Sequence, residues 1–151
     1  MKRLEKKLLD IAREQMTEHK SFCDYTPEHG MVYKSRLNWI DDKPYYIEAY
    51  YTNEVEHLCV LSHEVGHLKT LPQLGGMTYY RENYFNTYHA EKVASLWAIN
   101  FLEGNGIKGK LLNDCIDELQ KALDSHYAYL NQWLDLKRVE LKTLKREAVL
   151  A

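Results

Sequence analysis

The chain has 151 residues, of which 45% are apolar and 28% are charged, and its net charge is −2. This length suits one domain with one hydrophobic core, so we expect residues 1–151 to form a single domain. The nearly balanced charge gives no indication of direct nucleic-acid binding or of attraction to an anionic membrane. No segment approaches the ~18 consecutive apolar residues that a membrane span needs.

The cysteines are odd in number and far apart in the sequence: Cys23, Cys59 and Cys115. They form neither a disulfide framework nor a CxxC pair for a thiolate metal site. The N-terminus starts basic, but charges interrupt it too often for the apolar stretch of a signal peptide. Reduced thiols and the lack of such a stretch predict a cytoplasmic protein.

The first third of the chain combines a predicted helix with predicted strands. Apolar residues at helical spacing predict an amphipathic helix over residues 2–19, followed by a loop over 21–30. Aromatic and β-branched residues predict strands over 31–40 and 45–51 that form a β-hairpin.

The rest of the chain is predicted to be helical. In this part of the chain, one helix is predicted to begin near Asn53 and to end near Thr70, because Pro72 is expected to stop it. An irregular link over 74–84 leads to a second helix over 87–102. The C-terminal helices, within 107–147, include a long polar helix over 127–146.

These elements together predict an α+β fold. The fold is expected to be mainly helical, with a small antiparallel β-hairpin or sheet packed on a core that contains the helix near residue 63. We expect this core to span about residues 30–102.

The segment His63-Glu64-Val65-Gly66-His67 carries the clearest chemical signal. On a helix, His63 and His67 lie on one face, one turn apart, and their imidazoles can reach one zinc ion. Glu64 is offset by about 100° and can serve as the general base that takes a proton from the attacking water. This is why H-E-x-x-H is typical of zinc metallopeptidases. The alternative is that two histidines merely pack on one helix face.

Gly66 inside this helix needs a physical reason, because glycine costs ~1 kcal/mol relative to alanine in a helix interior. A close approach of backbone from a neighbouring element would supply that reason. The sequence therefore predicts that another helix or strand contacts the helix at Gly66.

A catalytic zinc ion needs a third protein ligand, and Glu91 on the next predicted helix is the first candidate. Glu91 shares one helix face with Ala94, Ser95 and Ala98, whose small side chains would let the two helices come close. The alternatives are that Glu91 only interacts favourably with the helix dipole, or that His89 is the third ligand.

Residues 59–67 and 91–100 resemble the ImmA/IrrE family of metallopeptidases, whose members carry an HE(L/V)GH helix and a downstream E-x-x-A-x-x-(W/F)-A helix. The resemblance covers about residues 30–102. It implies that His63, His67 and Glu91 bind Zn²⁺ and that Glu64 is the catalytic base. It also implies a cytoplasmic endopeptidase with a protein substrate, for which a phage or mobile-element helix-turn-helix repressor is one candidate.

Two further hypotheses stay open at this point. The same ligands would serve a non-catalytic, zinc-stabilised module that binds a regulator protein without cutting it, although such a module has no physical need of Glu64. A third interpretation treats the motif as accidental, in a phage structural or DNA-associated protein. The sequence leaves the oligomeric state open.

Several other side chains are weaker candidates. The residues that could stabilise an oxyanion are His126, Tyr79, Tyr80, Tyr84 and Tyr88. His57 is expected on the surface, and Cys59, one turn before His63, in the core.

Overall fold

The computed structural model describes the backbone of residues 2–15, 21–22, 35–40, 43–49, 54–132 and 135–150. The helices are α1 (Lys2–Gln15), α2 (Glu54–Leu74), α3 (Gly76–Glu82), α4 (Tyr84–Gly104), α5 (Gly109–Leu130) and α6 (Leu141–Leu150). The strands are β1 (Ser21–Phe22), β2 (Ser35–Ile40) and β3 (Lys43–Ala49). The end of the predicted first helix, residues 16–19, lies outside the described residues.

The expected α+β fold class, with a β-hairpin packed on a core that contains the helix of His63 and His67, is wrong. Among the residues whose side-chain burial is described, about 86% are helical and none lies in a strand. The short strands have the order β1-β3-β2, and β2 pairs antiparallel with β3 through the backbone. The core that can be described lies mainly among helices packed against one another, so a local β preference does not decide the fold class.

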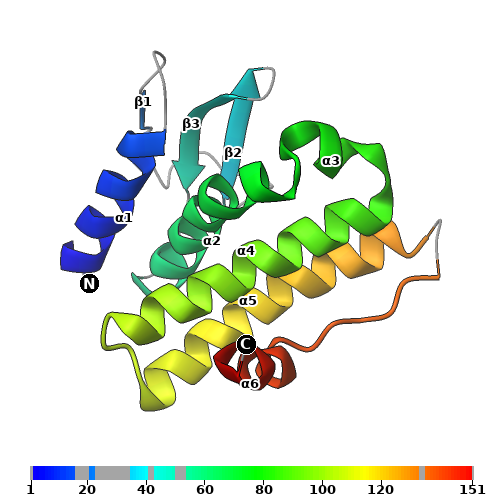
Figure 1. Cartoon of the computed structure of the whole chain (residues 1–151). Coiled ribbons are helices and arrows are strands. Elements are labelled where there is room, and N and C mark those ends of the chain that lie inside the picture. Colours follow the sequence, from blue (N-terminus) through cyan, green and yellow to red (C-terminus); the bar gives the residue numbers. More distant parts are fainter. Residues whose placement is uncertain are drawn as a thin grey trace.

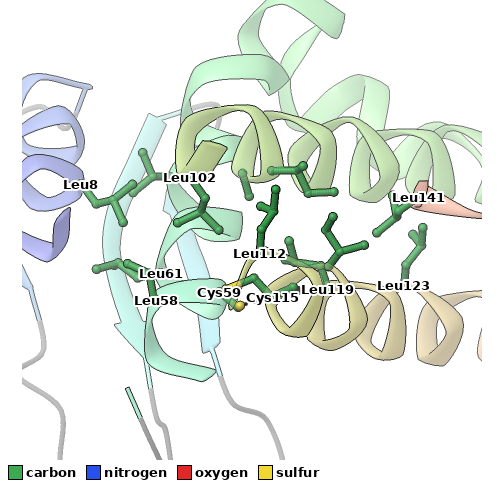
Figure 2. Close-up of a cluster of buried hydrophobic side chains, with 14 of the residues drawn as sticks. Leu8, Leu58, Cys59, Leu61, Leu102, Leu112, Cys115, Leu119, Leu123 and Leu141 are labelled. Atoms are coloured by element: carbon green, nitrogen blue, oxygen red, sulfur yellow. Dashed lines mark hydrogen bonds between the residues drawn. The ribbon is translucent and has the colours of Figure 1, made fainter. Parts of the chain in front are cut away.

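The core lies where α1, α2, α4 and α5 meet (Figure 1). Figure 2 shows leucines of α2, α4 and α5 gathered in this core, with Cys59 and Cys115 side by side between α2 and α5. The most deeply buried large side chains include Leu8, Leu68, Ile99, Leu102 and Leu123. None of the helices in the described ranges combines the length and apolar character that a bilayer span requires.

Helix α2 continues past the point where Pro72 was expected to end it. Pro72 lies inside the last turn of α2, where Leu71 is buried and Leu74 packs beside it. The free energy gained by burying these side chains outweighs the loss of the one backbone hydrogen bond that Pro72 cannot donate. The helix ends instead before Gly75, whose φ of 119° is in the region that glycine favours.

The predicted irregular link over 74–84 contains a short helix, α3. Met77 of α3 is buried, and Tyr80 packs against the same small cluster. Seven residues are too few for a clear helical period, which is why the pattern was not visible in the sequence. The position of α3 is important because it carries Tyr80 toward α4.

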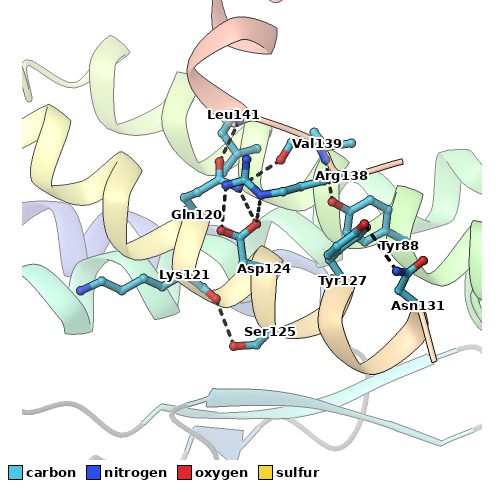
Figure 3. Close-up of polar contacts among 10 residues, drawn as sticks. All are labelled: Tyr88, Gln120, Lys121, Asp124, Ser125, Tyr127, Asn131, Arg138, Val139 and Leu141. Atoms are coloured by element: carbon cyan, nitrogen blue, oxygen red, sulfur yellow. Dashed lines mark hydrogen bonds and ion pairs between the residues drawn. The ribbon is translucent and has the colours of Figure 1, made fainter. Parts of the chain in front are cut away.

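The predicted long helix over 127–146 is also wrong. Helix α5 ends at Leu130, residues 135–140 are not helical, and α6 begins at Leu141. Figure 3 shows how side chains of α4 and α5 hold this connection: the Tyr88 hydroxyl accepts from the Val139 amide, and Gln120 binds Val139 and Leu141. These contacts with distant residues replace the helical hydrogen bonds that the local pattern predicts.

Candidate metal centre

Helix α2 places His63 and His67 on the face that points toward α4. Their ring centroids are 4.7 Å apart in an edge-to-face arrangement. Across from them, Glu91 on α4 directs its Oε2 atom at both rings, 2.8 Å from Nε2 of His63 and 2.9 Å from Nε2 of His67. The three ligand atoms of this group, which we call the His63/His67/Glu91 group, all lie within 4.8 Å of one another.

The two helices can carry this group because their backbones approach closely at Gly66. A Cβ atom on Gly66 would lie 2.5 Å from the carbonyl oxygen of Ala94, which no side chain tolerates without a shift of backbone. Ala94 and Ala98, on the facing side of α4, are completely buried. The prediction that a neighbouring element contacts the helix at Gly66 is therefore confirmed. The small residues Ala94 and Ala98 let the backbones of α2 and α4 come this close.

Two further side chains fix the orientation of the ligands. Ser95 Oγ is hydrogen-bonded to Nδ1 of His63 at 3.0 Å, so that Nε2 faces Glu91. The Tyr80 hydroxyl donates to Oε1 of Glu91 at 2.8 Å, so that Oε2 faces the histidines. Such outer contacts hold metal ligands in place and are typical of metal sites.

The charges in the group stabilise one another. Burial alone would raise the pKa of the Glu91 carboxyl, but the charge of His67 and hydrogen bonds from both histidines hold it well below its usual range. Burial likewise opposes the charged form of His67, but the Glu91 carboxylate outweighs it and raises the pKa of His67 to about 9. Burial and the nearby Glu91 raise the pKa of Tyr80, which keeps its hydroxyl protonated as a donor.

The donor set fits a divalent metal ion. Two imidazole nitrogens and one carboxylate oxygen form the ligand set of a catalytic zinc site. Ser95 and Tyr80 bind the outer atoms of His63 and Glu91, while Nε2 of both histidines and Oε2 of Glu91 face one another. The His63/His67/Glu91 group can therefore hold a metal ion.

Glu64 lies next to this group. Its side chain is buried, and its charge contributes to raising the pKa of both His67 and Tyr80. The Glu64 carboxylate therefore lies near enough to the group for its charge to act on His67 and Tyr80.

The weaker candidates His89, His57 and Cys59 lie outside the His63/His67/Glu91 group. His89 packs its ring against Tyr79, at a centroid distance of 6.5 Å, and does not belong to the metal-binding group found among the described residues. His57 is largely shielded rather than on the surface, with Nε2 3.8 Å from the Glu5 carboxylate of α1. Cys59 is buried, as expected, and its thiol lies 3.6 Å from the carbonyl oxygen of Cys115.

Two of the five oxyanion candidates come close to Glu91: Tyr80 and His126. His126 of α5 has Nε2 3.6 Å from Glu91 Oε2. Tyr88 instead binds Val139, and Tyr84 is exposed.

The sequence did not reveal that Ser95 orients His63. The available signal was its spacing, because Ser95 follows Glu91 by four residues and shares its helix face.

Comparison with known proteins gives no further assignment: no family model, curated protein or solved structure matches the chain significantly.

Proposed function

We propose that this protein is a zinc-dependent endopeptidase that hydrolyses peptide bonds of a cytoplasmic protein substrate. The observation that supports this most strongly is the convergence of His63, His67 and Glu91 within 4.8 Å, with the buried carboxylate of Glu64 beside them. Two imidazoles, one carboxylate ligand and one further carboxylate are the components that metal-assisted hydrolysis requires.

Each residue of the site has a distinct role in this proposal. His63, His67 and Glu91 would hold the zinc ion, while Ser95 and Tyr80 keep two of these ligands in orientation. When bound, zinc would supply a Lewis acid that polarises the scissile carbonyl and lowers the pKa of water. Glu64 would accept the proton of the attacking water and then deliver it to the nitrogen of the leaving amine.

The substrate class in this proposal follows from the resemblance of residues 59–67 and 91–100 to the ImmA/IrrE metallopeptidases. A helix-turn-helix repressor of a phage or mobile element is the protein substrate that this resemblance favours. The arrangement of Glu91 opposite the HEVGH segment is compatible with the resemblance, since it brings the two matching segments together.

The test uses a peptide library prepared from a whole proteome, incubated with the zinc-loaded protein and analysed by mass spectrometry for new termini. The parent protein is expected to cut, and Glu64→Gln is expected to keep zinc while losing turnover by at least about a hundredfold, the usual scale of general acid–base catalysis. Glu14→Gln, which changes an exposed glutamate on α1, is the matched control and should cut like the parent.

Two results would oppose the proposal. Equal cleavage by the parent and Glu64→Gln would remove Glu64 from the mechanism. Zinc binding without any cleavage, in the library and with a co-expressed repressor, would favour the non-catalytic zinc-stabilised binding module.

A further inference from the structure

A fourth side chain, from a different helix, borders the His63/His67/Glu91 group. His126 of α5 places Nε2 3.6 Å from Oε2 of Glu91, the same oxygen that His63 and His67 approach. The three ligands come from α2 and α4, whereas His126 comes from the C-terminal part of the chain, outside the segments that resemble the metallopeptidases.

His126 differs from the three ligands in its exposure to solvent. Its side chain is 40% exposed, whereas that of Glu91 is 6% exposed. It also lies outside the set of ligand atoms that are mutually within 4.8 Å. His126 is therefore placed beside the metal-binding group on a side that solvent reaches, and a bound substrate must enter from such a side.

The turn of α5 that carries His126 is firmly held (Figure 3). Two residues before it, Asp124 accepts two hydrogen bonds of 2.9 Å from Arg138. Directly after it, Tyr127 packs its ring 5.9 Å from that of Tyr88 on α4. Contacts on both sides thus join the helix to neighbouring parts of the chain, and the imidazole of His126 projects from a packed helix rather than from a loop.

We propose that His126 is a further catalytic residue, whose ring N–H donates a hydrogen bond to the carbonyl oxygen of a substrate held at the His63/His67/Glu91 group. This inference rests on the proposed function. An imidazole carries at least one N–H in each protonation state near neutrality, so the donor role needs no particular charge. The carbonyl oxygen gains negative charge as water adds to the carbon, and a donor fixed beside it stabilises that charge. No bond to His126 forms or breaks.

The experiment uses the full chain loaded with Co²⁺ in place of zinc and acetohydroxamate as the probe. Acetohydroxamate presents a carbonyl oxygen to the metal, and the visible absorption of Co²⁺ reports both metal binding and probe binding. The variants are His126→Ala, His126→Gln, which restores an N–H donor, and His89→Ala, a control histidine on α4 that packs against Tyr79.

His126→Ala is expected to bind Co²⁺ as tightly as the parent but to weaken acetohydroxamate binding about tenfold, the scale of one hydrogen bond to a charged group. His126→Gln should recover most of the loss, and His89→Ala should bind the probe like the parent. The substitution of this partly exposed side chain should leave the thermal unfolding temperature unchanged.

Two results in the His126→Ala variant would overturn the role of His126. If His126→Ala lost Co²⁺ affinity and changed the spectrum of the probe-free protein, His126 would be a metal ligand. If neither metal nor probe binding changed, His126 would be a bystander. A parent that bound no Co²⁺ would overturn this inference and the proposed function together. A parent that bound metal and probe but cut no peptide would overturn the proposed function, and a loss of probe binding in His126→Ala would then show His126 only as a hydrogen-bond donor to a bound ligand.

Discussion

Gly66 in α2 lies so close to Ala94 in α4 that a Cβ atom on the glycine would be 2.5 Å from the alanine carbonyl oxygen. This contact lies between the two ligand-bearing turns, since Gly66 directly precedes His67 and Ala94 follows Glu91 by three residues. The approach of the two helices and the assembly of the metal-binding group are therefore one structural feature.

Gly66→Ala is expected to push the helices apart. Overpacking of this kind lowers the free energy of unfolding by about 1–3 kcal/mol, and zinc affinity should fall with it because Glu91 moves away from the histidines. Urea unfolding and a chelator competition assay measure the two effects. Gly104→Ala is the control, because its Cβ meets nothing within 4 Å and should leave stability equal or raise it by up to about 1 kcal/mol. Equal stability of Gly66→Ala and the parent would show that the helices are not in close contact.

Tyr80→Phe removes the donor to Oε1 of Glu91. Loss of such an outer contact typically weakens metal binding by about 10–100-fold, because the carboxylate is no longer held in one orientation. Chelator competition for zinc measures the change. Tyr79→Phe, on the neighbouring residue, should bind zinc like the parent, since the ring of Tyr79 packs on His89 instead. The same affinity in both variants would mean that Tyr80 does not orient Glu91.

Ser95→Ala removes the partner of His63 Nδ1. The ring of His63 would then be held only through Nε2, and zinc affinity should fall by about tenfold or more because the ligand is less firmly oriented. Isothermal titration of the metal-free protein with zinc measures it. Ser125→Ala, at an exposed position on α5, serves as the control. Unchanged zinc affinity in Ser95→Ala would exclude Ser95 from the site.

The contact between Asp124 and Arg138 should make stability depend on acid pH. The hydrogen bonds from Arg138 lower the pKa of the Asp124 carboxyl below its ordinary 3.8. The stabilisation is therefore present above pH 3.8 and is lost as pH falls through the lowered pKa of the folded state. Because both side chains are partly exposed, solvent screens the pair and the effect on the free energy of unfolding is expected to be small.

Urea unfolding between about pH 5 and about pH 2 tests this dependence. Asp124→Asn should lose less stability than the parent as the pH falls, whereas Asp135→Asn, at an exposed position in the following segment, should follow the parent. Parallel curves for the parent and Asp124→Asn would contradict the pairing.

The site was more accessible to sequence analysis than the fold. The spacing of His63 and His67, and of Glu91 with the small residues Ala94 and Ala98, follows from the period of one helix, which a sequence shows directly. The same period predicted a continuous helix past Asn131. The helix ends there instead, because the Asn131 side chain accepts a hydrogen bond from the Leu136 amide and the Tyr88 hydroxyl accepts one from the Val139 amide. Such contacts leave no periodic signal in the sequence.

The fold class failed for a related reason. Aromatic and β-branched residues report a local preference for extended backbone, but the described core is formed by helical residues that are far apart in the chain, such as Leu8, Ile99 and Leu123. Packing between different helices also places Tyr80 and His126 beside Glu91. The sequence named both as candidates but could not place either of them, because Tyr80 on α3 and His126 on α5 lie on other helices than the ligands.

The measurement that tests the central claim most directly is the zinc content of the purified protein, determined by elemental analysis for the parent, Glu91→Gln and His67→Ala. The proposed site requires one zinc ion per chain in the parent and a large loss in both variants, because each of them removes one of the three ligands that hold the ion. Glu14→Gln, on the surface of α1, should retain the full content. A parent without zinc after exposure to the metal, or a Glu91→Gln variant that holds as much zinc as the parent, would contradict the metal site and the peptidase function built on it.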